Sequence, residues 1–159
     1  MLDRVPRDLP RCGMAAPTDP FEGSDFTVDL GTGEEVRFSR VDLPVAHVDE
    51  VAYRSGTDRS NEARMQPGRA GYSRLVLTRG LTTDLSLWTW WKSARDGDPH
   101  VDRDVRVRLL DATRAPVLAW RFRNAFPAAY RVSPLVAGSG EVVLETVELV
   151  FDSMEVEAT

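Results

Sequence analysis

The sequence predicts a mainly β fold, a small β-barrel or sandwich with one flanking Trp-rich α-helix. Several segments alternate apolar and polar residues, as half-buried strands do. Only the segment between Thr83 and Gly97 has the spacing of a helix, and it lies between strands. A chain of this kind closes its sheet and uses its helix as a plug or an outer flank.

The length of 159 residues indicates one domain, which we place at residues 21–159. The Pro-rich residues 1–20 are expected to form a flexible N-terminal segment.

Four strands are expected in the first half of the chain. Residues 26–30 and 34–41 alternate around the turn at 31–33 and predict a β-hairpin. Residues 51–54 and 72–79 predict two more strands, and Leu75 and Leu77 share one face of the second.

Residues 55–71 are polar and rich in turn formers. A connection of this length is uncommon in a compact domain unless it has a function. The segment is therefore either disordered or an arm that binds a partner, and we favour the arm.

The expected helix begins with Thr83 or Asp84 as its cap and is ended by Gly97 and Pro99. Its tryptophans fit two roles, packing in the core or binding a partner. We expect Trp88 to face inward and Trp90 to face outward. The residues assigned to these two roles are Asp84, Leu87, Trp88, Trp90 and Trp91.

After the helix, period-two alternation returns in residues 104–111, 117–124, 126–132 and 141–151, which predict four strands. Glu145 lies on the same face of the last strand as Val143, Val147 and Leu149. It is either an exposed position at the register edge or the partner of an arginine in a neighbouring subunit, because an unpaired buried carboxylate is costly.

Composition argues against several classes of protein. The net charge of −5 disfavours nucleic acid as the main partner, because phosphate binding needs a positive field. No apolar run approaches the roughly 20 residues of a membrane span, so no membrane insertion is expected. Cys12 is the single cysteine, which excludes an intrachain disulfide and fits a reducing cytoplasm.

Residues with the chemistry of a catalytic or metal site are scarce. His47 and His100 are the only histidines, and no Cys/His cluster has metal-ligand spacing. Asp96 and Asp98 flank Gly97 and are interpreted as solvated acids in turns rather than a calcium loop. We therefore expect no enzyme activity, no cofactor and no metal site.

Residues 72–91, YSRLVLTRGLTTDLSLWTWW, resemble the contractile phage tail-tube family, including the inner-tube proteins of extracellular contractile injection systems. In that family a strand of "LTLKRG" type precedes an Asp, a Leu and a Trp-rich helix. The matching positions here are Leu75, Leu77, Arg79, Gly80, Asp84, Leu87, Trp88 and Trp91.

Other blocks follow in the same order as in the family. Residues 26–28 and 36–39 resemble its opening strands. Residues 53–56, Asn61 and Pro67–Gly68 resemble its "EYREG…N…LPG" connection, and residues 120–127 resemble its "W.L.NAWP" block. Residues 145–149 resemble the closing "IETLEL" strand. Residues 41–44 depart from the family, which often has Gly-Leu after the second strand.

The resemblance implies a structural subunit that forms hexameric rings, which stack into a hollow tube. Its partners would be copies of itself, a sheath protein, baseplate or cap proteins, and cargo or DNA in the lumen. It would be assembled in a bacterial cytoplasm as part of a phage tail or a phage-like particle. The arm that contacts the next subunit or ring would contain Arg54, Ser55, Gly56, Asn61, Arg64, Pro67 and Gly68, and the core motif Trp120, Phe122, Asn124 and Pro127.

Two alternatives remain at the level of sequence. The chain could be a tube initiator or baseplate protein that forms one ring and does not propagate. It could also be a monomeric β-barrel that binds a small apolar ligand, with Trp88, Trp91 and Trp120 lining the cavity.

Overall fold

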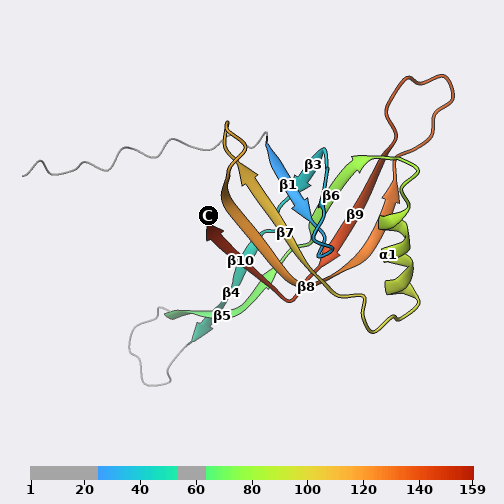
Figure 1. Cartoon of the computed structure of the whole chain (residues 1–159). Helices are drawn as coiled ribbons and strands as arrows, with labels where there is room; N and C mark the ends of the chain where they lie inside the picture. Colours follow the sequence, from blue (N-terminus) through green and yellow to red (C-terminus); the bar gives the residue numbers. More distant parts are fainter. Residues whose placement is uncertain (1–24, 54–63) are drawn as a thin grey trace, which may run out of the picture.

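The computed structural model describes residues 25–53 and 64–159, and within these ranges the fold is mainly β with one helix (Figure 1). The predicted flexible segment, residues 1–20, lies outside the described residues. The first strands are β1 (Phe26–Asp29), β2 (Glu35–Val36), β3 (Arg40–Asp42), β4 (Ala46–Tyr53), β5 (Arg64–Tyr72) and β6 (Leu75–Gly80). Helix α1 (Ser86–Arg95) precedes β7 (Arg103–Leu110), β8 (Pro116–Val132), β9 (Leu144–Val150) and β10 (Ser153–Ala158).

One antiparallel sheet runs in the order β2-β1-β7-β8-β9-β6-β3, with β10 also paired to β8. The 17-residue strand β8 connects its two halves. The first part of β8 pairs with β7 on one side and β10 on the other, and its second part pairs with β9. Strand β8 is visibly curved in Figure 1, so the sheet folds over onto itself.

The bend in β8 lies near Asn124, which has a positive φ of 52°. Asparagine tolerates this left-handed conformation better than most residues. Its side-chain Nδ2 donates a hydrogen bond to Asp152 Oδ2 at 2.8 Å, which joins the bend to the turn between β9 and β10. Its backbone N–H donates to Asp104 Oδ1 at 3.4 Å.

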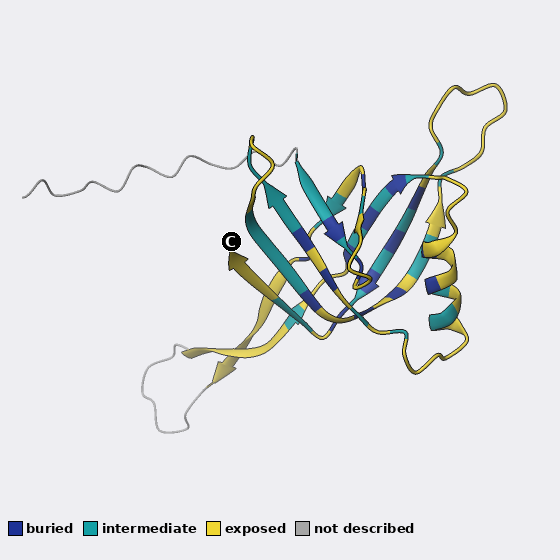
Figure 2. Ribbon diagram, viewed as in Figure 1, coloured by how far each residue is buried: buried dark blue, intermediate teal, exposed yellow. Residues whose placement is uncertain are grey.

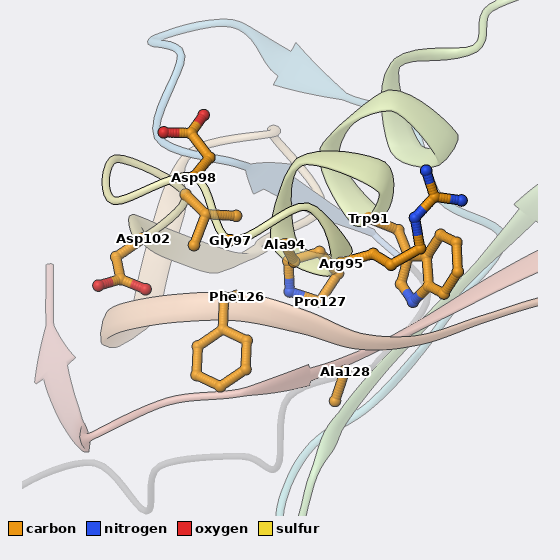
Figure 3. A pocket seen from close by; sticks show the side chains of 10 residues that line it. Trp91, Ala94, Arg95, Gly97, Asp98, Asp102, Phe126, Pro127 and Ala128 are labelled. Carbon is orange, nitrogen blue, oxygen red and sulfur yellow. The ribbon is translucent and has the colours of Figure 1, made fainter.

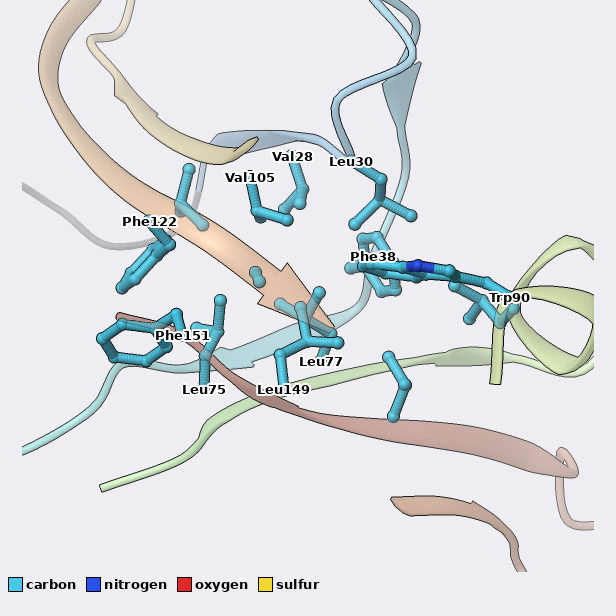
Figure 4. Packing of buried hydrophobic residues seen from close by; sticks show 14 residues of the cluster. Val28, Leu30, Phe38, Leu75, Leu77, Trp90, Val105, Phe122, Leu149 and Phe151 are labelled. Atoms are coloured by element: carbon cyan, nitrogen blue, oxygen red, sulfur yellow. The ribbon is translucent and has the colours of Figure 1, made fainter. Parts of the chain in front are cut away.

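The two halves of the sheet face each other across the core (Figure 4). Val28, Val105 and Phe122 contribute from one half, and Leu75 and Leu149 from the other, and all five are fully buried. The predicted face shared by Leu75 and Leu77 is therefore confirmed as the core face of β6.

Helix α1 packs its Leu87 and Trp90 side chains into this core, with only 1% and 2% of their surfaces exposed. Trp90 Nε1 donates to the Val101 carbonyl at 2.8 Å, and the Arg103 guanidinium lies 4.6 Å from the centre of its ring. Trp88 is 38% exposed. The prediction that Trp88 faces inward and Trp90 outward is therefore wrong, because the helix face that points to the core is the one shared by positions 87 and 90.

The start of α1 also differs from the prediction. Leu85 occupies the N-cap position and makes no side-chain capping bond, so neither Thr83 nor Asp84 is the cap. The Asp84 carboxylate nevertheless accepts hydrogen bonds from the backbone N–H and the hydroxyl of Ser86, at 3.0 and 2.9 Å. It thereby satisfies a donor at the helix start. The helix ends at Arg95, and Gly97 follows with a φ of 76°, as expected for a terminating glycine.

Several predicted strands have different limits. The predicted strand 34–41 is divided between β2 and β3, which pair with different neighbours. The predicted strands 117–124 and 126–132 are one continuous strand, β8, in which Asn124 lies at a register shift in the pairing with β7. The predicted strand 141–151 begins only at Leu144, and β10 was not predicted. Within the described part of the chain, no helix combines the length and the apolar character needed to cross a membrane.

The different burial of Trp90 and Trp88 gives a direct test of the helix orientation. Trp90→Ala should lower the free energy of unfolding by about 3–5 kcal/mol, because it leaves a cavity in the core. Trp88→Ala should lower it by only about 1 kcal/mol, because the ring is partly solvated. Urea denaturation of both variants measures the difference. An equal or larger loss in Trp88→Ala would show that the helix presents another face to the sheet.

Candidate functional site

Strands β4 and β5 form a two-stranded hairpin, called the arm here, that projects from the body of the protein (Figures 1 and 2). Every residue of β4 is exposed, and so is every residue of β5 except the half-buried Gly71. A hairpin that packs against nothing is only marginally stable in water. The arm is therefore a surface that gains stability when another molecule covers it.

The arm is attached to the body at its base. The Ser73 N–H donates to the Val45 carbonyl at 3.0 Å, and the Val45 N–H donates to the Ser73 hydroxyl at 2.8 Å. The Tyr72 ring lies 5.5 Å from the Phe151 ring at the edge of the core. The hydrogen bonds close the base of the hairpin, the aromatic contact joins it to the core, and the rest of its length is exposed.

Two glycines of β5 let side chains of β4 lie flat across the hairpin. A Cβ at Gly68 would lie 2.8 Å from Val51 Cγ2 and 2.9 Å from the Asp49 carbonyl. A Cβ at Gly71 would lie 2.7 Å from the His47 ring. The close approach of Val51 and Asp49 therefore explains the glycine at position 68, which resembles the glycine of the family's connection.

The structure revises the predicted connection 55–71, because residues 64–72 are strand β5 and not an irregular loop. Arg64, Pro67 and Gly68 lie on this strand, and Pro67 is opposite Glu50 of β4. The other residues assigned to the arm, Arg54, Ser55, Gly56 and Asn61, lie outside the described residues. The predicted strand 51–54 covers only the end of β4, which begins at Ala46. Strand β5 contains Pro67, Gly68 and Gly71, which hide a strand in the sequence.

The margins of the main sheet are a second candidate surface. Strands β2 and β3 end the sheet order, and β10 pairs with β8 on one side only among the described residues. Edge strands present backbone N–H and C=O groups that another chain can pair with. The six-residue β10 is the longest of these edges.

A buried ionic network joins the helix to the sheet. Arg79 Nε and Glu145 Oε1 are 2.5 Å apart, on directly paired positions of β6 and β9. The Tyr130 hydroxyl donates to the other Glu145 oxygen at 2.8 Å, and Arg79 Nη1 lies 3.1 Å from Asp84 Oδ2. Glu145 is 1% exposed. It is thus neither an exposed edge position nor in need of an arginine from a neighbour, because its arginine partner lies in the same chain.

This environment changes the ionisation of two groups in the network. Burial, together with the hydrogen bond to Glu145, raises the pKa of Tyr130 to about 12. Hydrogen bonds from Ser86, supported by Arg79, lower the pKa of the Asp84 carboxyl. The Tyr130 hydroxyl is therefore neutral and the Asp84 carboxyl ionised at neutral pH, which fits a structural role.

The outer face of β1, β7, the first part of β8 and β10 carries a band of charge. Arg106, Arg108, Arg121 and Arg123 lie on β7 and β8, and the acidic residues of β2 and β10 flank them. Arg108 pairs with Glu35 at 2.9 Å, Arg121 with Asp104 at 2.8 Å and Arg123 with Glu155 at 3.2 Å. Exposed ion pairs of this kind contribute little to stability. The charged side chains make this a solvent-facing surface of the sheet and not part of the core.

The residues of the predicted core motif lie along β8 and have separate roles. Phe122 is fully buried, with its ring 4.9 Å from the Phe151 ring, and Trp120 is half-buried on the same face. Asn124 forms the bend. Pro127 lies with Phe126 and Trp91 at a cleft of about 560 Å³ between the end of α1 and β8 (Figure 3). Trp88 and Trp120 do not line this cleft, so the three tryptophans proposed to bind an apolar ligand are not gathered there.

In residues 25–53 and 64–159, no group of three or more His, Cys, Asp or Glu side chains could hold a metal ion. His100 lies beside the exposed turn that follows α1, where its backbone N–H donates to Asp98 Oδ1 at 2.9 Å. The histidine and its acidic neighbours therefore belong to a turn.

The sequence of residues 23–155 matches the family model of the T4-like virus tail tube protein gp19. The chain belongs to this family. It is accordingly a structural tail-tube protein and not an enzyme. No curated protein matches this chain.

Solved structures similar to this tail-tube protein share its fold. A chain of the PVC sheath-tube complex of an extracellular contractile injection system, in its extended state, is 21% identical with a TM-score of 0.79, and the match covers 90% of this chain and 95% of that one. A chain of the anti-feeding prophage (AFP) tube-terminating cap is 21% identical with a TM-score of 0.77, covering 91% and 95%. Hcp1 from Flavobacterium johnsoniae is more distant, at 13% identity and a TM-score of 0.55, covering 84% and 95%.

The buried network makes one stability prediction. Glu145→Ala should destabilise the tail-tube protein by about 3–5 kcal/mol, because Arg79 is left buried without its closest partner. The double variant Arg79→Met/Glu145→Leu should regain most of this loss, since two apolar side chains replace the pair. Arg123→Ala, which breaks an exposed pair, is the control and should cost less than about 1 kcal/mol. Chemical denaturation of the three variants would contradict the argument if Glu145→Ala behaved like the control.

Tyr130 makes a second prediction, on pH dependence. Its pKa in the folded state, about 12, lies above the ordinary value of about 10. The neutral hydroxyl therefore stabilises the fold fully below about pH 10, and this contribution is lost as the pH rises toward 12. Ultraviolet titration of tyrosinate should show one late-ionising group, which Tyr130→Phe removes and Glu145→Gln shifts to lower pH. Loss of the late group in Tyr53→Phe instead would contradict the assignment.

Proposed function

We propose that this tail-tube protein assembles into hexameric rings that stack into the hollow inner tube of a contractile phage tail or a phage-like contractile injection system. The observation that carries the proposal is the arm, which extends from the body with almost all of its residues exposed. The sheet margins at β2, β3 and β10, which no further described strand covers, are the second support, since edges that meet head to tail close into rings or continue as filaments.

The similar structures give the proposal its geometry. One is a 6-fold symmetrised baseplate of the anti-feeding prophage, and others are a sheath-tube complex and a tube-terminating cap. By analogy, the partners of this chain are its own copies, a sheath protein, and baseplate or cap proteins, with cargo or DNA passing through the lumen. The polar outer faces of the sheet are suited to a water-filled lumen.

Within this scheme each part of the chain has a separate task. Residues 21–159 form the domain that builds the ring, and the arm, with Arg64, Pro67 and Gly68 on β5, reaches an adjacent subunit or ring. The exposed Trp88 of α1 is available to the sheath. Asp84 precedes the helix, and its carboxylate is engaged by Ser86 and Arg79.

A tube initiator that forms a single ring is the second candidate, because one similar structure is a baseplate. The two candidates differ in whether the ring repeats. The initiator would give rings alone at any concentration, whereas a tube subunit would give rings that elongate.

Shortening the arm tests the proposal. Replacing residues 47–71 by Asn-Gly should close a tight hairpin between Ala46 and Tyr72, which are paired directly. The variant should remain folded and form rings, but it should not form tubes, while the parent forms both. Negative-stain electron microscopy and sedimentation velocity read this out. A parent that stays monomeric at all concentrations and salt conditions would overturn the proposal, and long tubes from the variant would overturn the role of the arm.

A further inference from the structure

An apolar surface lies at the end of the protein opposite to the arm. Its main part is the long loop between β8 and β9, where Leu135, Val136 and Val142 are 79%, 63% and 74% exposed. Leu81 and Leu85, in the segment before α1, are 41% and 61% exposed. We call these five residues the apolar end. Exposed apolar side chains that gather in one place mark contact surfaces in soluble proteins.

The loop is held in place at its base. The Ser133 N–H donates to the Leu144 carbonyl at 2.8 Å, and the Leu144 N–H donates to the Ser133 hydroxyl at 3.0 Å. The Leu81 N–H donates to the Val143 carbonyl at 2.8 Å, which ties the loop to the segment before α1. Residues 133–144 enclose an open cleft of about 760 Å³. The apolar end is therefore anchored by three hydrogen bonds at its base and is hollow enough to receive side chains.

One face of the arm carries two apolar pairs, with Glu50 and Pro67 between them. Val48 pairs with Ala70, and Ala52 pairs with Met65, and side chains of paired residues lie on the same face of a hairpin. Val48 and Ala52 are four residues apart on one strand, so both pairs share that face. Val48 is 53% exposed and Met65 is 59% exposed.

The two apolar surfaces lie at opposite ends of the same strand. Strand β6 begins beside the base of the arm at Ser73 and ends at Gly80, next to Leu81 of the apolar end. Figure 1 shows the arm and the loop between β8 and β9 projecting in opposite directions, and Figure 2 shows both as exposed. A single chain cannot bring them together. Head-to-tail stacking brings the arm of one copy to the apolar end of the next copy in every repeat, because such contacts join two different surfaces of the same protein.

We propose that the apolar end of one copy binds the Val48–Met65 face of the arm of the next copy, and that this contact is what lets one ring recruit another. The inference rests on the proposed stacking of rings and adds its receptor surface. A second copy is the favoured occupant because it supplies an exposed apolar partner at the opposite end. Inside the polymer the contact covers both surfaces at once.

The charge content of the two surfaces agrees with an apolar contact. Among residues 133–144 of the loop, Glu141 is the only charged side chain. The matching face of the arm carries Glu50, which follows Val48 at the alternate position of β4. Because Glu141 and Glu50 carry the same charge, electrostatic attraction between them cannot drive the contact. The removal of valine, leucine and methionine side chains from water has to drive it.

Charge placed in the apolar end is the first test. Val136→Asp/Val142→Asp should keep the rings but lower the equilibrium constant for ring stacking by at least about tenfold, since the contact would bury two carboxylates without partners. Thr89→Asp, which adds a charge at an exposed position of α1, is the matched control and should elongate like the parent. Tube length by negative stain and circular dichroism of the subunit are measured together. Tubes of normal length from the double variant would overturn the inference and leave the proposed function intact, whereas a parent without rings or tubes would overturn the proposed function itself.

Cross-linking between copies tests the same contact without disturbing the apolar side chains as strongly. In a Cys12→Ser background, a Leu135→Cys chain mixed with a Met65→Cys chain should give a covalent dimer with a short bis-maleimide under tube-forming conditions. A Thr89→Cys chain mixed with Met65→Cys is the control and should give little of this product. Equal yields from the two mixtures, or none from the first, would show that the arm binds elsewhere.

Discussion

The architecture depends on one strand that serves both halves of the sheet. Strand β8 pairs first with β7 and β10 and then with β9, so breaking its register would separate the two faces of the core. The left-handed conformation of Asn124 bends the strand at a register shift in its pairing with β7, and Asp152 holds the bend from the next turn. Because the halves fold over each other, their apolar faces are covered and their polar faces remain outside.

The same folding explains why the functional surfaces are separate from the core. The core is closed by Leu87 and Trp90 of α1, and the Arg79–Glu145 pair fixes the segment before the helix against β6 and β9. The arm and the apolar end extend β6 in its two directions, where the core no longer covers side chains. A subunit built in this way is complete in its interior and incomplete at its two ends, as a stacking unit needs to be.

The sequence predicted the parts of this structure whose signal is local. Alternation at Leu75 and Leu77 identified the core face of β6, and the order of short motifs identified the family. It failed where the answer depends on distant contacts: the two Trp positions 88 and 90 are both apolar, and only packing against β8 decides which is buried. Strand β5 was missed because Pro67 and its glycines are poor strand formers, and the arginine partner of Glu145 was misplaced because a cross-strand neighbour cannot be seen in a linear pattern.

The central claim is that the arm obtains from another copy the packing that its own chain does not provide. Hydrogen–deuterium exchange compared between dissociated subunits and assembled tubes tests this most directly, because a lone hairpin opens readily whereas a covered one does not. The account predicts that amides of residues 46–53 and 64–72 exchange rapidly in subunits and become strongly protected on assembly, while those of β6 and β9 are protected in both states. Arm amides that exchange as fast in tubes as in subunits would contradict it.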